Sequence, residues 1–344
     1  MADDTPPTSQ SAPAHVQLIQ MGRAHVTSRT VYAAAKLGLA DHLASSPKSA
    51  TELACEMHVH ARSLHRLMRT LASLGVLTEQ PEQRFALTAL GEALKTGAPG
   101  SARSAVIFSG NPSGQSGWDN LVYAVQTGKT GFEKAHGMAF FDYLAQHHDE
   151  ASLFSEMMVG MHSEEPPAVS AAYDFSAFKT IVDVGGASGN VLATILADHA
   201  GPRGILFDRP HVLRDAPALL KAKGVSDRVT IEPGDFFLRV PTGADAYILS
   251  HIIHDWDEDR CLAILGHIRK AIEPTGRLLI IEMVLAAGDA PHPGKMLDMA
   301  MLVQTGGEER SEAEYAILLA KAGFRLTRAV STSSAATVVE AVVA

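Results

Sequence analysis

Cysteine is scarce in this chain of 344 residues, which contains only Cys55 and Cys261. Two cysteines are too few for a disulfide framework or a cysteine-based zinc site, and they fit a reducing cytosol. A run of about 20 apolar residues, which a membrane-spanning helix needs, is also lacking. The first residues, MADDTPPTSQSAPA, lack the basic and apolar regions of a secretory signal. We therefore expect a soluble, cytoplasmic protein that is neither exported nor inserted into a membrane.

Positive charge is in short supply as well. Lys and Arg total 29 against 38 Asp and Glu, which gives a formal net charge of -9. Such a balance repels polyphosphate, so we expect no nucleic-acid partner. Hydrophobic residues make up 46% of the chain and charged residues 19%, as in an ordinary globular protein rather than a disordered one.

The N-terminal half has mostly helical periodicity, from Val16 to about Gly160. Within it, Ser49-Ala-Thr51-Glu opens a short helix, and a second helix begins at Ala61. Leu77-Thr-Glu and Arg84-Phe-Ala-Leu-Thr can pair as a β-wing. This is the pattern of a winged helix, which DNA-binding repressors share, so the fold does not settle the function. The balance of charges favours a structural role.

The C-terminal half alternates apolar strands with helical segments. The expected strands are Thr180–Val184, Gly204–Asp208, Val229–Glu232, Ala246–Leu249 and Gly276–Glu282, with further strands within Phe324–Val343. Helix-length segments such as Asp259–Ile272 connect them. This alternation predicts an α/β domain with a mainly parallel sheet and right-handed crossovers.

A glycine-rich turn, Asp183-Val-Gly-Gly-Ala-Ser-Gly189, follows the first of these strands. Such a turn lies where nucleotides bind in open α/β sheets. A dinucleotide fingerprint would have glycine where Ala187 and Asn190 stand, so S-adenosylmethionine is favoured over NAD. The second strand ends at Asp208, which suits ribose hydroxyls. Asp235 and Phe236 follow the third strand and suit adenine.

Four motifs occur in a specific order: Asp183-Val-Gly-Gly, Asp208-Arg-Pro-His-Val, Gly234-Asp-Phe-Phe and His254-Asp-Trp-Asp. With them the chain resembles the caffeic acid O-methyltransferase-like family, and more closely its bacterial natural-product branch. The resemblance implies a Rossmann-like class I methyltransferase domain with a mostly parallel seven-stranded sheet, preceded by a winged-helix-like dimerisation domain.

The resemblance also implies a domain organisation and a reaction. We expect a disordered tail over residues 1–14, a dimerisation domain over 15–100, a helical linker and pocket region over 101–178, and a methyltransferase domain over 179–344. The enzyme would use S-adenosylmethionine, without a metal, to methylate a hydroxyl of a small aromatic molecule. It would be a homodimer, for which residues 16–40 fit an amphipathic exchange helix.

Several site residues follow from the resemblance. Gly185, Asp208, Asp235 and Phe236 match cofactor-binding positions, beside Asp183 of the glycine-rich motif. Ser250 stands near where many plant relatives have a lysine close to the adenine. Ala187 departs from the glycine usual in the first motif, a change that we expect the site to tolerate.

Methyl transfer from a sulfonium requires alignment of the acceptor oxygen and removal of its proton. His254 matches the family's base, and His251, three residues earlier, is its nearest competitor. Glu282 and Glu309 match the acidic residues that orient the base, although Glu308 leaves the register open.

The acceptor pocket is expected to draw on residues from both halves of the chain. The candidates are Trp118, Phe141, Met157, Met161, His162, Asp255, Asp298 and Met301. The sequence does not name the acceptor or its regiochemistry, and it leaves nitrogen and carbon nucleophiles open. Two rival interpretations remain at this point: a family member with non-methylating chemistry, such as decarboxylation, hydroxylation or cyclisation, and a DNA-binding regulator.

Overall fold

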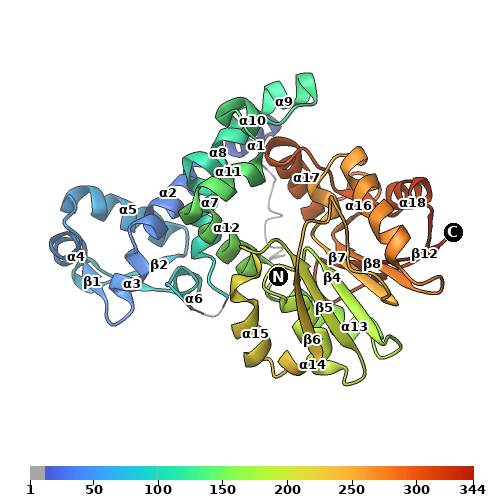
Figure 1. Cartoon of the computed structure of the whole chain (residues 1–344). Helices are drawn as coiled ribbons and strands as arrows, with labels where there is room; N and C mark the ends of the chain where they lie inside the picture. The colour runs from blue at the N-terminus through green and yellow to red at the C-terminus, as the bar shows by residue number, and fades with distance from the viewer. Residues whose placement is uncertain (1–11, 99) are drawn as a thin grey trace, which may run out of the picture. The chain divides into compact units, whose positions relative to one another are not determined.

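The computed structural model describes residues 12–98 and 100–344 (Figure 1). They form two compact units. The first runs to Gly114 and includes Asp149–Met161, and the second comprises Gln115–His148 and His162–Ala344. Residues 1–11 of the expected disordered tail lie outside the described residues. None of the helices in the described part of the chain has the length and apolarity that a bilayer crossing requires.

The first unit is mainly helical and carries a small three-stranded sheet. Its elements are α1 (Ala14–Gly22), α2 (Ala24–Lys36), α3 (Leu39–Leu43), β1 (Lys48–Ser49), α4 (Ala50–Met57), α5 (Ala61–Ser73), β2 (Leu77–Gln80), β3 (Arg84–Leu87), α6 (Ala89–Glu92), α7 (Arg103–Gly110) and most of α12 (His148–Met161). The expected helix start at Ser49 is confirmed by a capping box with Glu52. The antiparallel pairing of β2 with β3 confirms the wing.

The expectation of one exchange helix over residues 16–40 is wrong in detail. The segment is divided into α1, α2 and α3, with breaks at Arg23 and at Gly38, whose φ of 65° is left-handed. Glycine adopts that conformation readily, which explains the second break. Leu18, Ile19 and Met21 of α1 are 69%, 57% and 69% exposed, so α1 carries large apolar side chains that the chain itself leaves uncovered.

A seven-stranded sheet organises the second unit. Its order is β11 (Phe324–Ser331), β12 (Thr337–Val343), β8 (Arg277–Glu282), β7 (Ala246–Ser250), β4 (Thr180–Val184), β5 (Arg203–Asp208) and β6 (Val229–Pro233). The strands from β8 to β6 are parallel, whereas β12 is antiparallel to both of its neighbours. The mostly parallel sheet expected from the sequence is thereby confirmed.

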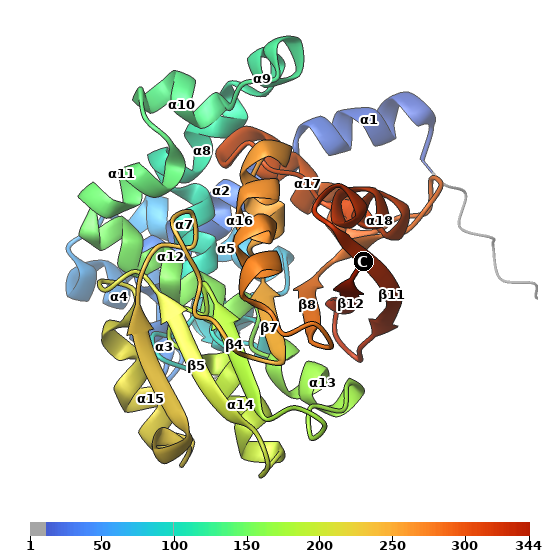
Figure 2. The same ribbon diagram turned by 45° about the vertical axis from the view of Figure 1, so that its right-hand side comes forward.

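Helices cover both faces of this sheet (Figure 2). α13 (Glu165–Ala172), α14 (Asn190–Asp198) and α15 (Ala216–Ala222) contribute to one core, and α16 (Glu258–Ala271) and α18 (Glu312–Lys321) to the other. On β7, Tyr247 and Leu249 belong to the core with α16 and α18, while Ala246 and Ile248 belong to the opposite core. Strand side chains alternate between faces, so a strand buried on both sides is apolar throughout.

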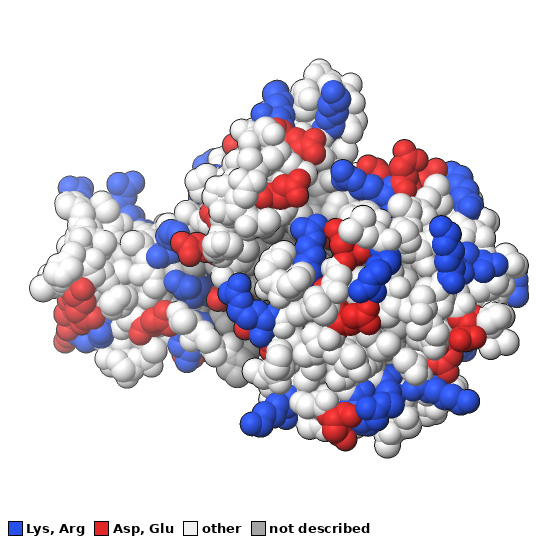
Figure 3. Space-filling model, in the orientation of Figure 1, with Lys and Arg blue, Asp and Glu red and all other residues white. Residues whose placement is uncertain are grey.

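The remaining elements of the second unit lie outside this sandwich. They are α9 (Leu121–Thr127), α10 (Gly131–His136), α11 (Phe140–Gln146), α17 (Pro293–Gln304), the short paired strands β9 (Val284–Leu285) and β10 (Arg310–Ser311), and most of α8 (Pro112–Asp119). Short 3₁₀ turns span Pro81–Gln83, Leu213–Asp215, Ser226–Arg228 and Ile253–Asp255. On the face shown in Figure 3, basic and acidic side chains are interspersed rather than gathered by sign.

The order of the strands indicates where a ligand would bind. The chain runs from β4 outward to β5 and β6, then returns to β7 on the other side of β4. Ligands of open α/β sheets bind at such a reversal, outside the carboxyl ends of the strands. The segments after Val184 and Ser250 therefore border the expected binding crevice.

Candidate active site

The glycine-rich turn after β4 contains three left-handed residues, Gly185, Ala187 and Gly189. Gly185 has a φ of 75°, and a Cβ at this position would lie 2.4 Å from Cδ1 of Ile252. Ala187 has a φ of 50°, a left-handed conformation that glycine adopts more readily than alanine. Its N–H donates to Oδ2 of Asp208 at 2.9 Å, a bond that helps to hold the strained residue.

Carboxylates lie at the ends of three neighbouring strands. Asp183 and Asp208 are buried, and burial together with the charge of Asp208 raises the pKa of Asp183 to about 7. Burial also raises the pKa of Asp208, whose Oδ1 accepts the N–H of Arg209 at 2.6 Å. Oδ1 of Asp235 accepts the N–H of Phe237 at 2.8 Å. These bonds fix the carboxylates of Asp208 and Asp235 and leave lone pairs for a ligand, while both oxygens of Asp183 have no hydrogen-bond partner among the described residues.

Aromatic rings stand beside these carboxylates. The Phe236 ring lies 4.9 Å from that of Phe237 and 6.2 Å from that of Trp256, centroid to centroid. Phe141 of α11 contacts Trp256, with centroids 5.4 Å apart. Ser250 is the last residue of β7 and pairs with Ile281 of β8.

This donor set fits S-adenosylmethionine. Carboxylates at strand ends accept hydrogen bonds from ribose hydroxyls, aromatic faces suit adenine, and an excess of buried carboxylates suits a sulfonium cation. When bound, the cofactor supplies an electrophilic methyl group. Asp183, Gly185, Asp208, Asp235, Phe236 and Ser250 remain our predicted contacts to it.

His254 is paired with Glu309 in the interior. The two side chains are buried, and Nδ1 of His254 lies 2.6 Å from Oε1 of Glu309. Because a carboxylate can only accept, Nδ1 carries the proton and Nε2 is left to act as a base. Glu308 has a side chain 60% exposed and pairs with Arg310 instead. The structure thus places Glu309, and not Glu308, against His254.

Glu282 holds the backbone of the same segment. It is fully buried, and its Oε1 accepts the N–H groups of Ile252, Ile253 and His254 at 3.1, 2.7 and 3.1 Å. Its Oε2 accepts the hydroxyl of Tyr315. The two carboxylates that the sequence offered as orienters therefore have different roles, since Glu309 orients the ring and Glu282 orients the backbone.

The charges around His254 set its protonation. Burial alone would lower its pKa, but the charge of Glu282, the hydrogen bond to Glu309 and the charge of Asp255 raise it to about 10. Burial raises the pKa of Glu309 as well. Without ligands, this raised pKa favours the imidazolium at neutral pH. A cationic ligand nearby would lower the pKa, and the neutral imidazole can then accept a proton at Nε2.

This charge balance predicts a pH profile. Because His254 must be neutral to accept a proton, kcat/KM should rise with pH through an apparent pKa well above 6.5. Glu309→Gln should lower that apparent pKa by about 1–2 units, since an amide no longer stabilises the imidazolium. The acid limb should then move to lower pH while the plateau falls. Glu308→Gln is the matched control, and equal shifts in both variants would contradict the assignment.

The residues predicted to bind the acceptor are divided between the two units. Oδ1 of Asp298 accepts the N–H of Glu309 at 2.9 Å, so this residue also supports the orienter. Asp255 lies 3.9 Å from Nε2 of His254, and burial raises its pKa to about 7. Met157 and Met161 belong to the first unit, whereas the second unit contains Trp118, Phe141, His162, Asp255, Asp298 and Met301. Their contacts with an acceptor stay predictions.

The sequence interpretation missed several supporting residues. Tyr315 anchors Glu282, and a Cβ at Gly307 would lie 1.9 Å from the carbonyl oxygen of His254. The Gly306-Gly307 pair just before Glu309 was a usable signal of close approach. For Glu165 the sequence offered only the nearby His162, three residues earlier, and gave no sign of its other partner, His251.

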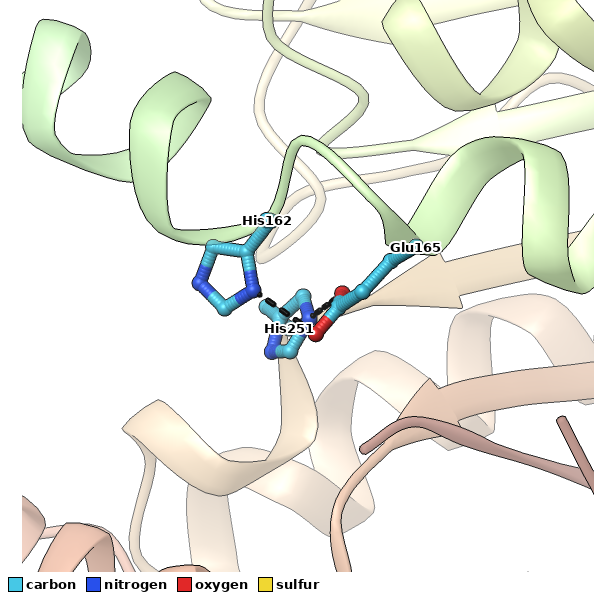
Figure 4. A group of neighbouring side chains, drawn as sticks. All are labelled: His162, Glu165 and His251. Atoms are coloured by element: carbon cyan, nitrogen blue, oxygen red, sulfur yellow. Dashed lines mark hydrogen bonds and ion pairs between the residues drawn. The ribbon is translucent and has the colours of Figure 1, made fainter. Parts of the chain in front are cut away.

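Glu165 joins His162 and His251 in a second cluster (Figure 4). Each residue offers one ligand atom, and the three atoms lie within 4.8 Å of one another. However, Nε2 of His251 lies only 2.6 Å from Oε2 of Glu165. Ligands of one tetrahedral zinc ion are about 3.3 Å apart, so a metal would have to separate this pair. We therefore interpret the cluster as hydrogen-bonded.

Comparisons with known proteins agree with this geometry. Residues 118–325 match the O-methyltransferase domain family, and residues 19–97 match the O-methyltransferase dimerisation domain. A phenazine O-methyltransferase of Lysobacter antibioticus is 43% identical over 324 residues, or 94% of this chain and 95% of that protein.

Solved structures show the same likeness. Mitomycin 7-O-methyltransferase has a TM-score of 0.90 at 35% identity, covering 96% of this chain and 98% of that one. An O-methyltransferase from neocarzinostatin biosynthesis, in complex with S-adenosylmethionine and 2-hydroxy-5-methyl naphthoic acid, has a TM-score of 0.82 at 31% identity, covering 92% and 96%.

The fold and the matches define a class I methyltransferase. The chain belongs to the S-adenosylmethionine-dependent O-methyltransferases that combine a dimerisation domain with an O-methyltransferase domain. The family membership inferred from four ordered motifs is thereby confirmed.

Proposed function

We propose that this enzyme methylates a hydroxyl of a small aromatic natural product, with His254 as the general base. The observation that carries the proposal is the buried contact of 2.6 Å between Nδ1 of His254 and Oε1 of Glu309. The pair leaves Nε2 free to accept the proton as the acceptor oxygen bonds to the methyl carbon. The carbon–sulfur bond breaks in the same step, and its electrons stay on sulfur.

Relatives support the aromatic class of acceptor. One relative is a phenazine O-methyltransferase, and another structure contains a naphthoic acid. Rings of this kind would pack against side chains such as Trp118, Phe141 and Met301, which we propose as acceptor contacts together with Met157, Met161, His162, Asp255 and Asp298.

Product formation tests the proposal. We expect S-adenosylhomocysteine and an O-methylated ring when hydroxyphenazines or hydroxynaphthoates are supplied, and neither product when the same ring carries no hydroxyl. Cofactor binding without any methylated product would instead favour the non-methylating interpretation.

We also propose a homodimer that acts in the cytoplasm without a nucleic-acid partner. The dimerisation domain and the exposed apolar side chains of α1 support the homodimer. The free thiols of Cys55 and Cys261 fit a reducing compartment. The proposal also keeps the domain organisation expected from the sequence, with domains that begin at residues 15, 101 and 179. A monomeric mass in solution would contradict the dimer, and tight salt-dependent DNA binding would contradict the absence of a nucleic-acid partner.

A further inference from the structure

His251 is held in a strained position beside the proposed base. It follows β7 with a φ of 53°, in the left-handed region that non-glycine residues rarely adopt. Its N–H donates to the carbonyl of Ile281 at 3.1 Å, and its ring lies 5.2 Å from that of His254, centroid to centroid. Strain of this kind persists where surrounding contacts enforce it, and it is concentrated at functional sites.

Glu165 fixes the orientation of the His251 ring. Oε2 of Glu165 lies 2.6 Å from Nε2 of His251, and Oε1 lies 3.0 Å from Nδ1 of His162 (Figure 4). The His162 and His251 rings also contact each other, with centroids 3.9 Å apart. Glu165 is 6% exposed, and its carboxylate is hydrogen-bonded to His251 and within ion-pair distance of His162.

Protonation in this cluster follows from its contacts. Burial would raise the pKa of Glu165, but hydrogen bonds from the two histidines outweigh it and lower the pKa to about 2. Burial and the charges of His162 and His254 lower the pKa of His251, despite its bond to Glu165. His251 is therefore neutral and donates its one N–H, at Nε2, to an ionised carboxylate.

The other ring nitrogen of His251 is then a fixed acceptor. Nδ1 is buried and has no hydrogen-bond partner among the described residues. A buried acceptor without a partner costs about 1–3 kcal/mol, which a ligand with a suitable donor would recover. In this state it cannot donate to a ligand, so it discriminates between an O–H or N–H group and an ether or a carbonyl.

We propose that His251 selects acceptors that carry a second hydroxyl or an amino group on the ring atom next to the methylated hydroxyl. This inference rests on the proposed function, because it places the reacting hydroxyl at His254 and its neighbour at His251. The amino group of S-adenosylmethionine has the same donor chemistry and is the competing source.

Three acceptors test the inference: 2,3-dihydroxynaphthalene, 3-methoxy-2-naphthol and 2-naphthol. The wild type should prefer the dihydroxy compound over 2-naphthol by about 10-fold in kcat/KM, the value of one good hydrogen bond. His251→Phe keeps a ring but removes the acceptor nitrogen. It should abolish the preference through a raised KM for the dihydroxy compound, with a smaller rise in KM for 2-naphthol, which has no second donor.

A second variant keeps the inference testable if His251→Phe does not fold. In Glu165→Gln the new amide can donate to Nε2 of His251, which moves the ring proton to Nδ1. Nδ1 then donates instead of accepting, so this variant should narrow the preference for the dihydroxy compound and raise kcat/KM for the methoxy compound. Equal losses on all three acceptors in both variants would overturn the inference. So would weaker S-adenosylmethionine binding with the preference intact, because the donor group would then belong to the cofactor.

The two failures can be told apart. A wild type that binds S-adenosylmethionine but methylates neither these acceptors nor the hydroxyphenazines and hydroxynaphthoates contradicts the proposed function, and the inference falls with it. Turnover without any preference for the dihydroxy compound overturns the inference alone.

Discussion

Replacing His254 with glutamine should lower kcat by about 10²–10⁴-fold on an accepted phenol, the usual contribution of a positioned base. Glutamine can still hydrogen-bond to Glu309, so the buried carboxylate keeps a partner. S-adenosylmethionine affinity should stay within about threefold of wild type, since no proposed cofactor contact is removed. Steady-state kinetics and equilibrium binding of the cofactor measure the two quantities separately.

His148→Gln is the matched control for this loss. His148 is exposed at the start of α12 and has no proposed role in the site, so its variant should retain wild-type kinetics. Unchanged turnover in His254→Gln would move the base elsewhere, with His251 as the first candidate. A loss of cofactor binding equal to the loss of turnover would show a structural role instead.

The second large effect is expected from Gly185→Ala. The new Cβ would lie 2.4 Å from Cδ1 of Ile252, and the φ of 75° is strained for alanine. Cδ1 of Ile252 can turn aside, but Cγ1 of Ile252 at 3.1 Å and Cε1 of Phe236 at 3.4 Å also crowd the new Cβ. We expect a loss of about 2–4 kcal/mol in the free energy of unfolding and at least about 100-fold weaker S-adenosylmethionine binding.

Gly266→Ala provides the comparison on the same chain. Gly266 lies within α16, and a Cβ there would meet nothing within 4 Å. This variant should be more stable by about 0.5–1 kcal/mol, with unchanged cofactor affinity. Thermal unfolding and cofactor titration compare the pair. Wild-type cofactor affinity in Gly185→Ala would contradict the placement of this turn at the binding site.

The elements that the sequence predicted well are those governed by local rules. Ser49 and Glu52 form the capping box that their spacing implies, and β7 is apolar from Ala246 to Leu249 because both of its faces are buried there. The segment over residues 16–40 was harder, since its helical periodicity continues across the breaks at Arg23 and Gly38. Such breaks depend on single backbone conformations that apolar spacing does not record.

The site shows a similar division. His254 and its nucleotide turn lie in motifs that can be found along the sequence, whereas Glu309 meets His254 from 55 positions away. Choosing Glu309 over Glu308 required knowing which side chain is buried. Glu165 was missed because its partner His251 is 86 positions away and the strand order brings them together. The joint effect of several charges on the pKa of His254 was likewise beyond a sequence argument.

Proton removal by His254 is the central claim, and acceptor acidity tests it most directly. One accepted phenol is varied by ring substituents so that the pKa of its hydroxyl falls from about 10 to below the assay pH. Wild type and His254→Gln are then compared across the series. The loss caused by His254→Gln should be large for the least acidic phenols and nearly absent for those already ionised, because an ionised oxygen needs no base. An equal loss across the whole series would contradict the account.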